Sequence, residues 1–147
     1  ALPPPQGGRF RRNKILMNRL LINIPGKPVS WKAPKRGRGK SMFTPADYRA
    51  WRDAADLIIQ IAARGATIKT PCRLLVTIYA DNLAADGTNI KKGVEDSLVR
   101  AGRDKKRGRQ GVLFDDSLKY LHESTFRLGG EDKKNPRVII LLETIGE

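Results

Sequence analysis

The sequence contains one cysteine and one histidine, and it has no acidic residue before Asp47. With Cys72 alone, no disulfide can form within the chain, which favours a reducing compartment such as the cytoplasm. Cys72 lies in an apolar segment and is expected to be a small core residue. No apolar run is long enough to cross a bilayer, so we expect neither a membrane span nor a signal peptide, and no membrane partner.

The shortage of acidic residues accompanies an excess of basic ones. The 147 residues include 29 Lys and Arg against 15 Asp and Glu, a formal net charge of +14. Eleven of the basic residues precede Asp47. A distribution so one-sided is typical of a protein that binds a polyanion, and nucleic acid is the commonest polyanion.

The first 16 residues differ in composition from the rest of the chain. They begin with Pro3-Pro4-Pro5 and Gly7-Gly8, turn basic, and offer little to bury, which predicts a flexible basic tail. The tail is either a true basic arm or an addition ahead of a natural start at Met17. Residues 17–147 have the length of one domain with a modest core.

Apolar alternation predicts four strands. They span 19–24, 72–78, 118–127 and 138–145, and the last is apolar nearly throughout, as expected of a central strand. His122 lies in the third strand and is expected to be structural.

Two segments have the periodicity of amphipathic helices. The first is expected to begin with Thr44 as the cap and Pro45 in the first helical position, and to end at Gly65. The second is expected to be capped by Asn89 or Thr88 and to end at Gly102. The expected buried positions are Tyr48, Trp51, Ala55, Ile58 and Ala62 in the first helix, and Ile90, Val94 and Leu98 in the second. This order predicts an α+β (two-layer α/β) fold, a single mixed sheet of about four strands with two helices on one face.

Carboxylates lie at both ends of the second helix. Asp86 precedes it, Asp115 and Asp116 follow it, and Lys92 lies one turn inside it. Mg²⁺ prefers hard oxygen ligands from one or two carboxylates, and Lys92 would neutralise charge that develops on a phosphate. In the alternative interpretation Asp86 caps the helix, Asp115 and Asp116 form a turn, and Lys92 pairs with Asp96 on the surface. Asp81 is a further ligand or, as its loop position favours, an aspartate that satisfies its own turn.

Two basic segments are candidate DNA contacts. In the first, Trp31 is interleaved with basic residues and serves either as a stacking group for a base or as the anchor of its loop in the core. The second is a loop after the second helix that we expect to be flexible and beside the carboxylates; a solvated charge run is the alternative. The predicted DNA-binding residues are Lys32, Lys35, Arg36, Arg38, Lys40, Lys105, Lys106, Arg107 and Arg109.

The pattern Asp86-x-Thr88-Asn89-x-x-Lys92-x-x-x-Asp96-x-Leu98, followed by Asp115-Asp116-Ser117, resembles the RusA family of Holliday-junction resolvases. The stretch Pro25-x-x-Pro28-x-Ser30, the basic glycine loop at Arg36-Gly37-Arg38 and the pair Tyr48-Arg49 extend the resemblance from about residue 17 to residue 145. Three departures are present: Thr88 replaces a family aspartate, Leu118 replaces a common glutamine, and an extra basic segment lies between Gly102 and Gly111.

This resemblance implies a bacterial or phage-encoded endonuclease that resolves four-way DNA junctions in recombination and repair. It implies a homodimer that needs Mg²⁺, with Mn²⁺ as a substitute, and no organic cofactor. The implied catalytic residues are Asp86, Lys92 and Asp116, and the implied metal contacts are Asp86, Asp115, Asp116 and Thr88. The alternative function is a non-catalytic basic nucleic-acid-binding protein, either a junction binder or a ribosome-associated factor.

Overall fold

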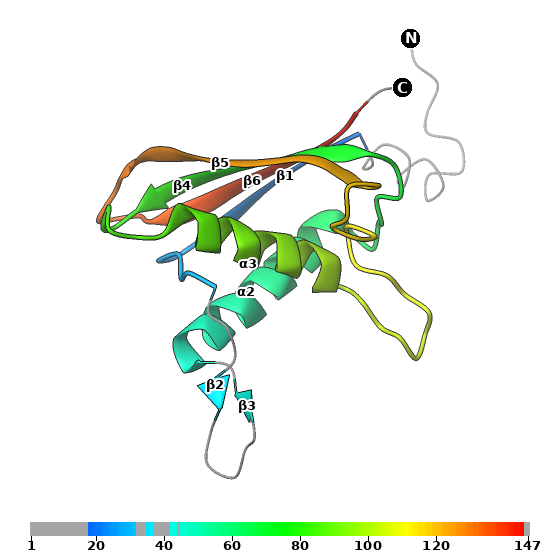
Figure 1. Cartoon of the computed structure of the whole chain (residues 1–147), viewed down its shortest axis with the longest axis horizontal. Coiled ribbons are helices and arrows are strands. Elements are labelled where there is room, and N and C mark those ends of the chain that lie inside the picture. The colour runs from blue at the N-terminus through cyan, green and yellow to red at the C-terminus, as the bar shows by residue number, and fades with distance from the viewer. Residues whose placement is uncertain (1–17, 32–34, 37–41, 44, 146–147) are drawn as a thin grey trace.

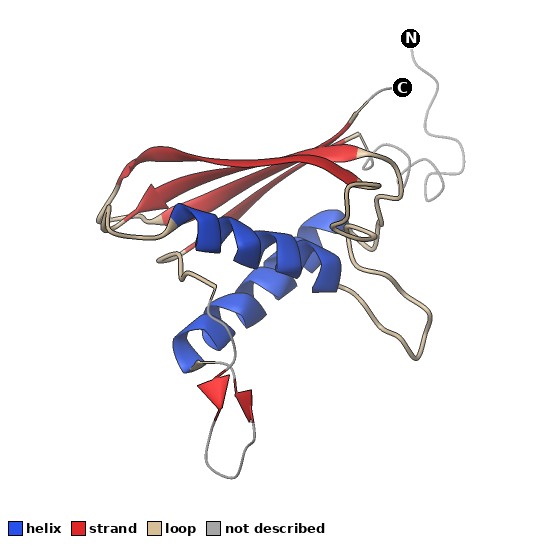
Figure 2. Ribbon diagram, viewed as in Figure 1, coloured by secondary structure: helices blue, strands red, loops and turns tan. Residues whose placement is uncertain are grey.

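The computed structural model describes residues 18–31, 35–36, 42–43 and 45–145. A twisted sheet forms one layer, and both helices lie on the same face of it (Figures 1 and 2). The predicted α+β fold, with one mixed four-stranded sheet and two helices, is confirmed. Neither helix has the length and apolar composition that crossing a bilayer requires, as far as the described residues go.

The sheet has the strand order β1-β6-β4-β5. Its strands are β1 (Arg19–Pro25), β4 (Cys72–Ala80), β5 (Leu121–Glu131) and β6 (Arg137–Thr144). β6 pairs antiparallel with β1 and β4, and β4 pairs parallel with β5. The prediction that the last strand is central is therefore confirmed, and its buried side chains Val138, Ile140 and Leu142 face the helices together with Leu74 and Val76 of β4.

The third strand begins later than predicted. Residues 118–120 belong to a turn, because the carbonyl oxygen of Ser117 accepts hydrogen bonds from the amides of Tyr120 and Leu121. The strand then continues to Glu131, beyond the predicted end. His122 lies in this edge strand with its side chain exposed, as expected of a strand residue outside any site.

Helix α2 (Ala46–Ala63) begins after Pro45, which is the N-cap and not the first helical residue as predicted. Thr44, the predicted cap, lies outside the described residues. The buried stripe continues from Ala55 through Ile59 and Ala63, whereas the predicted Ile58 and Ala62 lie at its half-buried margin. Three successive four-residue steps from Trp51 keep these positions on one face. The helix ends at Ala63, with Arg64 as its C-cap in the left-handed conformation, two residues before the predicted end at Gly65.

A small antiparallel pair, β2 (Lys35–Arg36) and β3 (Met42–Phe43), precedes α2 and was not predicted. A two-residue strand is too short to show alternation in the sequence, so the pattern there predicted only a loop.

Helix α3 (Gly87–Arg100) packs beside α2 on the same face of the sheet, with α3 against β4 and β5 and α2 against β1, and its predicted stripe of Ile90, Val94 and Leu98 is buried. Gly93 faces α2. A Cβ atom at this position would lie 3.3 Å from the ring and the hydroxyl of Tyr48, so the missing side chain permits the close approach of the two helices.

Candidate functional site

Asp86 is the N-cap of α3 and is exposed. Its Oδ1 accepts a hydrogen bond from the Asn89 amide at 3.2 Å, and its Oδ2 accepts one from Asn89 Nδ2 at 3.1 Å. The prediction that Asn89 or Thr88 caps the helix is wrong, because the aspartate one residue before the helix is better placed to accept from the third amide. Thr88 lies exposed in the first turn. A carboxylate has about four lone-pair sites, so Asp86 keeps two for another ligand.

Lys92 lies one turn further along α3, and its side chain is exposed. Its Nζ lies over the indole of Trp31, 4.7 Å from the ring centroid. The amide of Trp31 donates to the carbonyl oxygen of Asn89 at 3.1 Å, and the indole packs against the core. Trp31 therefore anchors its loop, as one of the two predicted roles requires, and it also carries Lys92 on its face.

Lys92 and Asp96 do not form the surface ion pair of the alternative interpretation among the residues described. The carboxyl of Asp96 is half-buried, and this burial raises its pKa. The charges of Lys92 and Arg100 oppose the rise, and those of Asp116 and Glu95 add to it. Asp96 thus lies near two cations, Lys92 and Arg100, and two anions, Asp116 and Glu95. It is not one of the predicted catalytic or metal-binding residues. Its place four residues after Lys92 and four before Arg100 is the sequence signal that puts all three on one face of α3.

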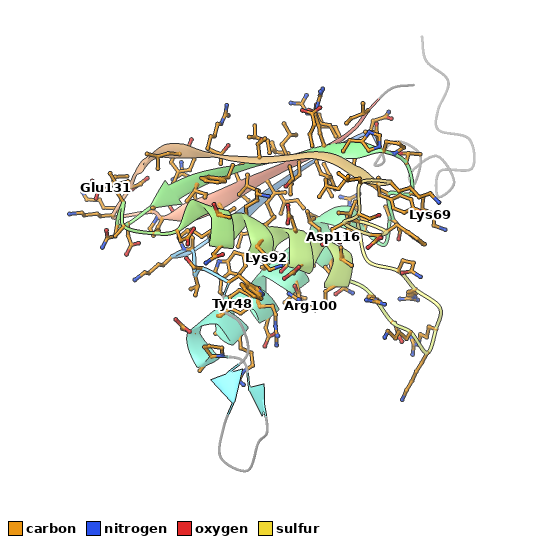
Figure 3. The ribbon with its side chains drawn as sticks, in the orientation of Figure 1. Tyr48, Lys69, Lys92, Arg100, Asp116 and Glu131 are labelled. Carbon is orange, nitrogen blue, oxygen red and sulfur yellow. The ribbon has the colours of Figure 1, made fainter. Side chains whose placement is uncertain are left out.

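Asp116 lies near this face although it belongs to the loop that leads into β5. Figure 3 labels Asp116, Lys92, Arg100 and Tyr48 over the middle of the helical layer, and the charge of Asp116 acts on Asp96. Asp115 Oδ1 accepts a hydrogen bond from the Asp116 amide at 3.0 Å, which holds the local turn. Asp86 stands apart from this group, since the ten residues from Asp86 to Asp96 correspond to about 15 Å along a helix axis.

Arg100 closes the C-terminal side of the cluster. Its Nε and Nη2 donate to the two carboxylate oxygens of Asp56 at 2.6 and 3.0 Å, and Nη2 also donates to Ser97 Oγ at 3.0 Å. Burial lowers the pKa of Arg100, but the hydrogen bonds and charge of Asp56 outweigh it, so the net shift is upward. This bidentate pair joins α3 to α2.

Two buried polar atoms of α2 face α3. Tyr48 and Trp51 are 3% and 7% exposed, yet the tyrosine hydroxyl and the indole N–H have no hydrogen-bond partner within the described part of the chain. Burial raises the pKa of the Tyr48 hydroxyl, and the nearby guanidinium of Arg100 opposes the rise. Arg100 Nε and Nη2 donate to Asp56 and Ser97, so the guanidinium acts on the Tyr48 hydroxyl chiefly through its charge.

The predicted metal ligands are oxygen donors, of which Asp86, Thr88 and Asp116 are exposed and Asp115 is half-buried. Across 18–31 and 45–145, no three acidic, histidine or cysteine side chains lie close enough together to hold one metal ion. Mg²⁺ commonly uses only one or two carboxylates and completes its coordination with water and substrate phosphate. Asp115 and Asp116 fit such a site by their chemistry, whereas Asp86, with the neutral oxygen of Thr88 near it, lies about 15 Å away along α3 and does not share that site within one chain.

The basic loop after α3 is folded and not an open coil. Asp104 and Arg109 exchange two backbone hydrogen bonds of 3.0 and 2.8 Å, and Asp104 Oδ1 accepts from the amides of Lys106 and Arg107. We call residues 104–109 the basic turn. It projects beyond the C-terminal end of α3 and so lies beside the Asp96 end of the cluster, away from Asp86 (Figure 1).

The other predicted DNA contacts lie in the N-terminal third of the chain. Lys32, Arg38 and Lys40 lie outside the described residues, as does the tail 1–16, and Lys35 and Arg36 are placed only as the backbone of β2. Asp81 is not at the cluster. It pairs with Lys27, with 3.6 Å between Oδ2 and Nζ, while Asn82 holds the turn by accepting a hydrogen bond from the Ala84 amide.

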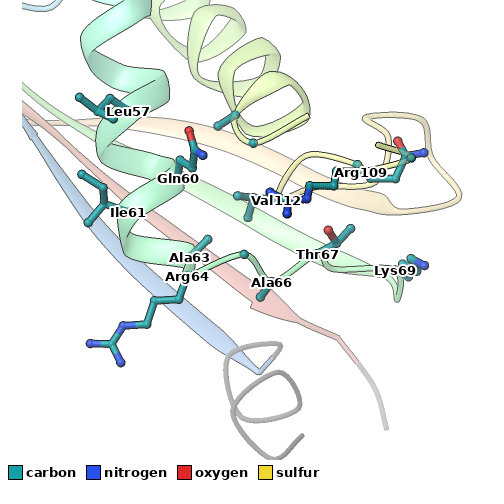
Figure 4. A pocket seen from close by; sticks show the side chains of 15 residues that line it. Leu57, Gln60, Ile61, Ala63, Arg64, Ala66, Thr67, Lys69, Arg109 and Val112 are labelled. Atoms are coloured by element: carbon teal, nitrogen blue, oxygen red, sulfur yellow. The ribbon is translucent and has the colours of Figure 1, made fainter. Parts of the chain in front are cut away.

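A groove of about 980 Å³ lies between the end of α2 and the basic turn (Figure 4). Its walls include Arg64, Lys69 and Arg109, together with the exposed Leu57 and Ile61. None of the predicted carboxylates lines it. The groove is therefore separate from Asp86, Asp115 and Asp116.

A comparison of the sequence with protein-family models finds no match, and neither does a comparison with curated proteins.

Proposed function

We propose that this protein is a Mg²⁺-dependent endonuclease that resolves four-way DNA junctions, as the resemblance to the RusA family implies. The observation that carries the proposal is that the charges of both Lys92 and Asp116 act on Asp96, although Asp116 is 24 positions after Lys92 and 20 after Asp96 in the sequence. These residues come from the two separate halves of the expected motif. The net charge of +14 supplies the attraction for DNA.

Each residue has a role that its surroundings permit. Asp116 offers ligand oxygens at one end of α3, with Asp115 as an accessory donor. Asp86 offers them at the other end, with Thr88 as a neutral contact, so the two groups would not share one ion within a single chain. When bound, Mg²⁺ supplies polarisation of the phosphodiester and a water of lowered pKa. Lys92 is exposed and not held by an ion pair among the described side chains, so its ammonium group is available to neutralise charge on the phosphate in the transition state.

The proposed substrate needs two sites. A four-way junction has two-fold symmetry, so a homodimer would cut its opposing strands symmetrically. The proposed place of action is the cytoplasm of a bacterium or of a phage-infected cell, in keeping with the single, buried Cys72.

Cleavage of a synthetic four-way junction and of a linear duplex, each with and without Mg²⁺, tests the proposal. We expect cleavage of the junction alone, and only with Mg²⁺. Asp116→Asn should abolish cleavage while junction binding persists, because the change removes a ligand charge and no phosphate contact. Asp53→Asn, an exposed carboxylate on α2, is the matched control and should cut normally. Full activity of Asp116→Asn would refute the assignment of this residue.

A second function, junction binding without cleavage, is supported by a different observation. The basic turn is exposed and organised by Asp104, and it needs neither Asp86 nor Asp116 to contact phosphate. Binding without Mg²⁺-dependent nicking in the same assay would favour this function.

A further inference from the structure

The groove between the end of α2 and the basic turn has two sides of different character. Leu57 and Ile61 lie four residues apart on α2, so they share one side of the helix. These two side chains are 58% and 66% exposed. Figure 4 shows Lys69 and Arg109 across the groove from them. The groove therefore offers apolar surface on one side and positive charge on the other.

The charged side chains at the groove all have the same sign. They are Arg64, Lys69 and Arg109, all exposed, and no acidic residue is among the described residues that line the groove. Like charges that share one groove repel one another, and a bound anionic group would offset that repulsion. A ligand that carries carboxylates or phosphates is therefore complementary to the groove in charge.

The uncharged lining distinguishes between these two kinds of anion. No aromatic side chain is among the described lining residues, so the bases of a single strand would find no stacking partner there. Leu57 and Ile61 instead offer aliphatic surface, which gains free energy when apolar side chains bury it. This lining favours a peptide over a nucleic acid.

The backbone around the groove favours the same class of ligand. Both helices end at the groove, α2 at Ala63 and α3 beside Ala101. Carbonyl groups at the C-terminal end of a helix carry a partial negative charge. A peptide has N–H groups that can donate to such carbonyls, whereas a phosphodiester backbone has no donor. Carboxylate side chains and backbone N–H groups thus suit the groove together.

From these features we propose that the groove binds a short acidic segment of a partner protein. Apolar side chains of that segment pack against Leu57 and Ile61, and its carboxylates lie toward Lys69 and Arg109. The chain itself has no run of more than two acidic residues, so the segment comes from another protein. The proposal goes beyond nuclease chemistry, because none of the predicted carboxylates lines the groove.

Binding of three labelled peptides, measured by fluorescence anisotropy with the full chain, tests the chemistry of the ligand. The probe is a short peptide of alternating aspartate and leucine. One control peptide has serine in place of leucine, and the other has lysine in place of aspartate. We expect the probe to bind, and each control peptide to bind roughly tenfold or more weakly. A probe that fails to bind, or that binds no better than the serine peptide, would overturn the proposal.

Two pairs of variants test the location. Lys69→Glu should weaken binding of the probe roughly tenfold, whereas Lys133→Glu, with the same change of charge, should have a much smaller effect. Lys133 is exposed and follows Glu131, which Figure 3 places at the opposite end of the molecule from Lys69. Ile61→Gln should weaken binding roughly fivefold through lost apolar contact. Leu21→Gln, at a strand position that is 64% exposed, should not.

Circular dichroism of each variant checks that it is folded. Equal losses in Lys69→Glu and Lys133→Glu would reduce the binding to general charge attraction and overturn the proposal. A single-stranded oligonucleotide whose binding depends on Lys69 while that of the probe does not would also overturn it, and would assign the groove to nucleic acid. Junction cleavage is measured without peptide, and Ile61→Gln should cut normally, so this proposal and the proposed function fail separately.

Discussion

Two sides of α3 carry similar residues in dissimilar surroundings. Toward β5, Lys91 Nζ lies 2.8 Å from Glu95 Oε2 and 3.1 Å from Ser124 Oγ, and the hydroxyl of Ser124 donates to Glu95. Toward α2, Lys92 and Asp96 have the same four-residue spacing, but no ion pair joins them in the described structure. Lys92 instead lies over Trp31.

The difference teaches that spacing alone does not assign a role to a charged pair. Lys91 and Glu95 are mostly buried and satisfy one another, as a pair that joins a helix to a sheet should. Lys92 is exposed, and Asp96 is near Asp116 and Arg100 without a matched partner. The first pair has a structural role, and the second leaves its charges available for chemistry.

Replacing Lys91 and Lys92 with alanine, one at a time, should separate the structural role of Lys91 from the proposed catalytic role of Lys92 most clearly. Lys92→Ala should lower junction cleavage by roughly 10²–10³-fold, because it removes a charge-stabilising group. It should cost less than about 1 kcal/mol of stability, since only an exposed cation–aromatic contact is lost. Lys91→Ala should destabilise the fold by about 1–3 kcal/mol, since Glu95 loses its cationic partner, and cleavage per folded molecule should persist.

Single-turnover cleavage and urea unfolding of both variants measure this contrast. The assignment of different roles to the two sides of α3 is wrong if Lys92→Ala mainly destabilises the protein, or if Lys91→Ala mainly slows cleavage.

Asp96→Asn should change how stability depends on pH. The folded protein raises the pKa of Asp96 above its ordinary value of 3.8, mainly through burial. The folded state therefore holds this proton more tightly than the unfolded state, and stability falls as pH rises from the ordinary pKa through the raised one. Asp96→Asn removes this loss and should be at least as stable as the wild type at pH 7.

Urea unfolding of both proteins across pH 3–8 gives the difference curve. Other shifted groups, such as Asp132 with its pKa lowered chiefly by a hydrogen bond from the Asn135 amide, occur in both proteins and cancel in the difference. A variant that is less stable than the wild type at neutral pH would show that the charged form of Asp96 is stabilising.

Of these variants, Thr88→Asp should have the smallest effect on cleavage and stability. It tests whether the proposed Mg²⁺ ion binds near position 88. The residue lies exposed in the first turn of α3, where a carboxylate also interacts favourably with the helix dipole, by about 0.3–1 kcal/mol. A second charge near Asp86 should lower the Mg²⁺ midpoint for cleavage several-fold. Thr88→Asn keeps the shape without the charge and serves as the control. An unchanged midpoint would mean that position 88 points away from the metal.

The sequence predicts local features of this fold well and long-range ones poorly. Alternation located three of the four strands closely, and the apolar run at 138–145 correctly indicated a central strand. Spacing also located the buried stripe of α3. The sequence left the cap open among Asp86, Thr88 and Asn89, which all have capping side chains; the backbone conformation selects Asp86, the cap of the alternative interpretation.

Alternation and residue spacing do not predict that Asp116 lies near Asp96. This proximity depends on the parallel pairing of β4 with β5, which obliges the chain to run back along α3 and start β5 beside the beginning of β4. The resemblance to a family implied that Asp116 belongs with Lys92. Asp96 belongs to the same motif but was not among the predicted site residues, and its surroundings appear only once α2 brings Tyr48 and Asp56 against the same face of α3.

The crossing at Gly111 has a consequence for how this protein can change in evolution. A Cβ atom there would lie 1.9 Å from the carbonyl oxygen of Val99, so the returning chain is pressed against the last turn of α3, and Leu113 is bonded by its amide to Leu98 at 2.9 Å. These two contacts close the base of the basic turn against α3, before the chain reaches Asp115. Because loop-closure entropy rises only slowly with length, residues can be gained or lost within it without displacing the acidic residues that follow. Under the proposed function, this segment is where related proteins would vary their contacts with DNA without displacing Asp115 and Asp116.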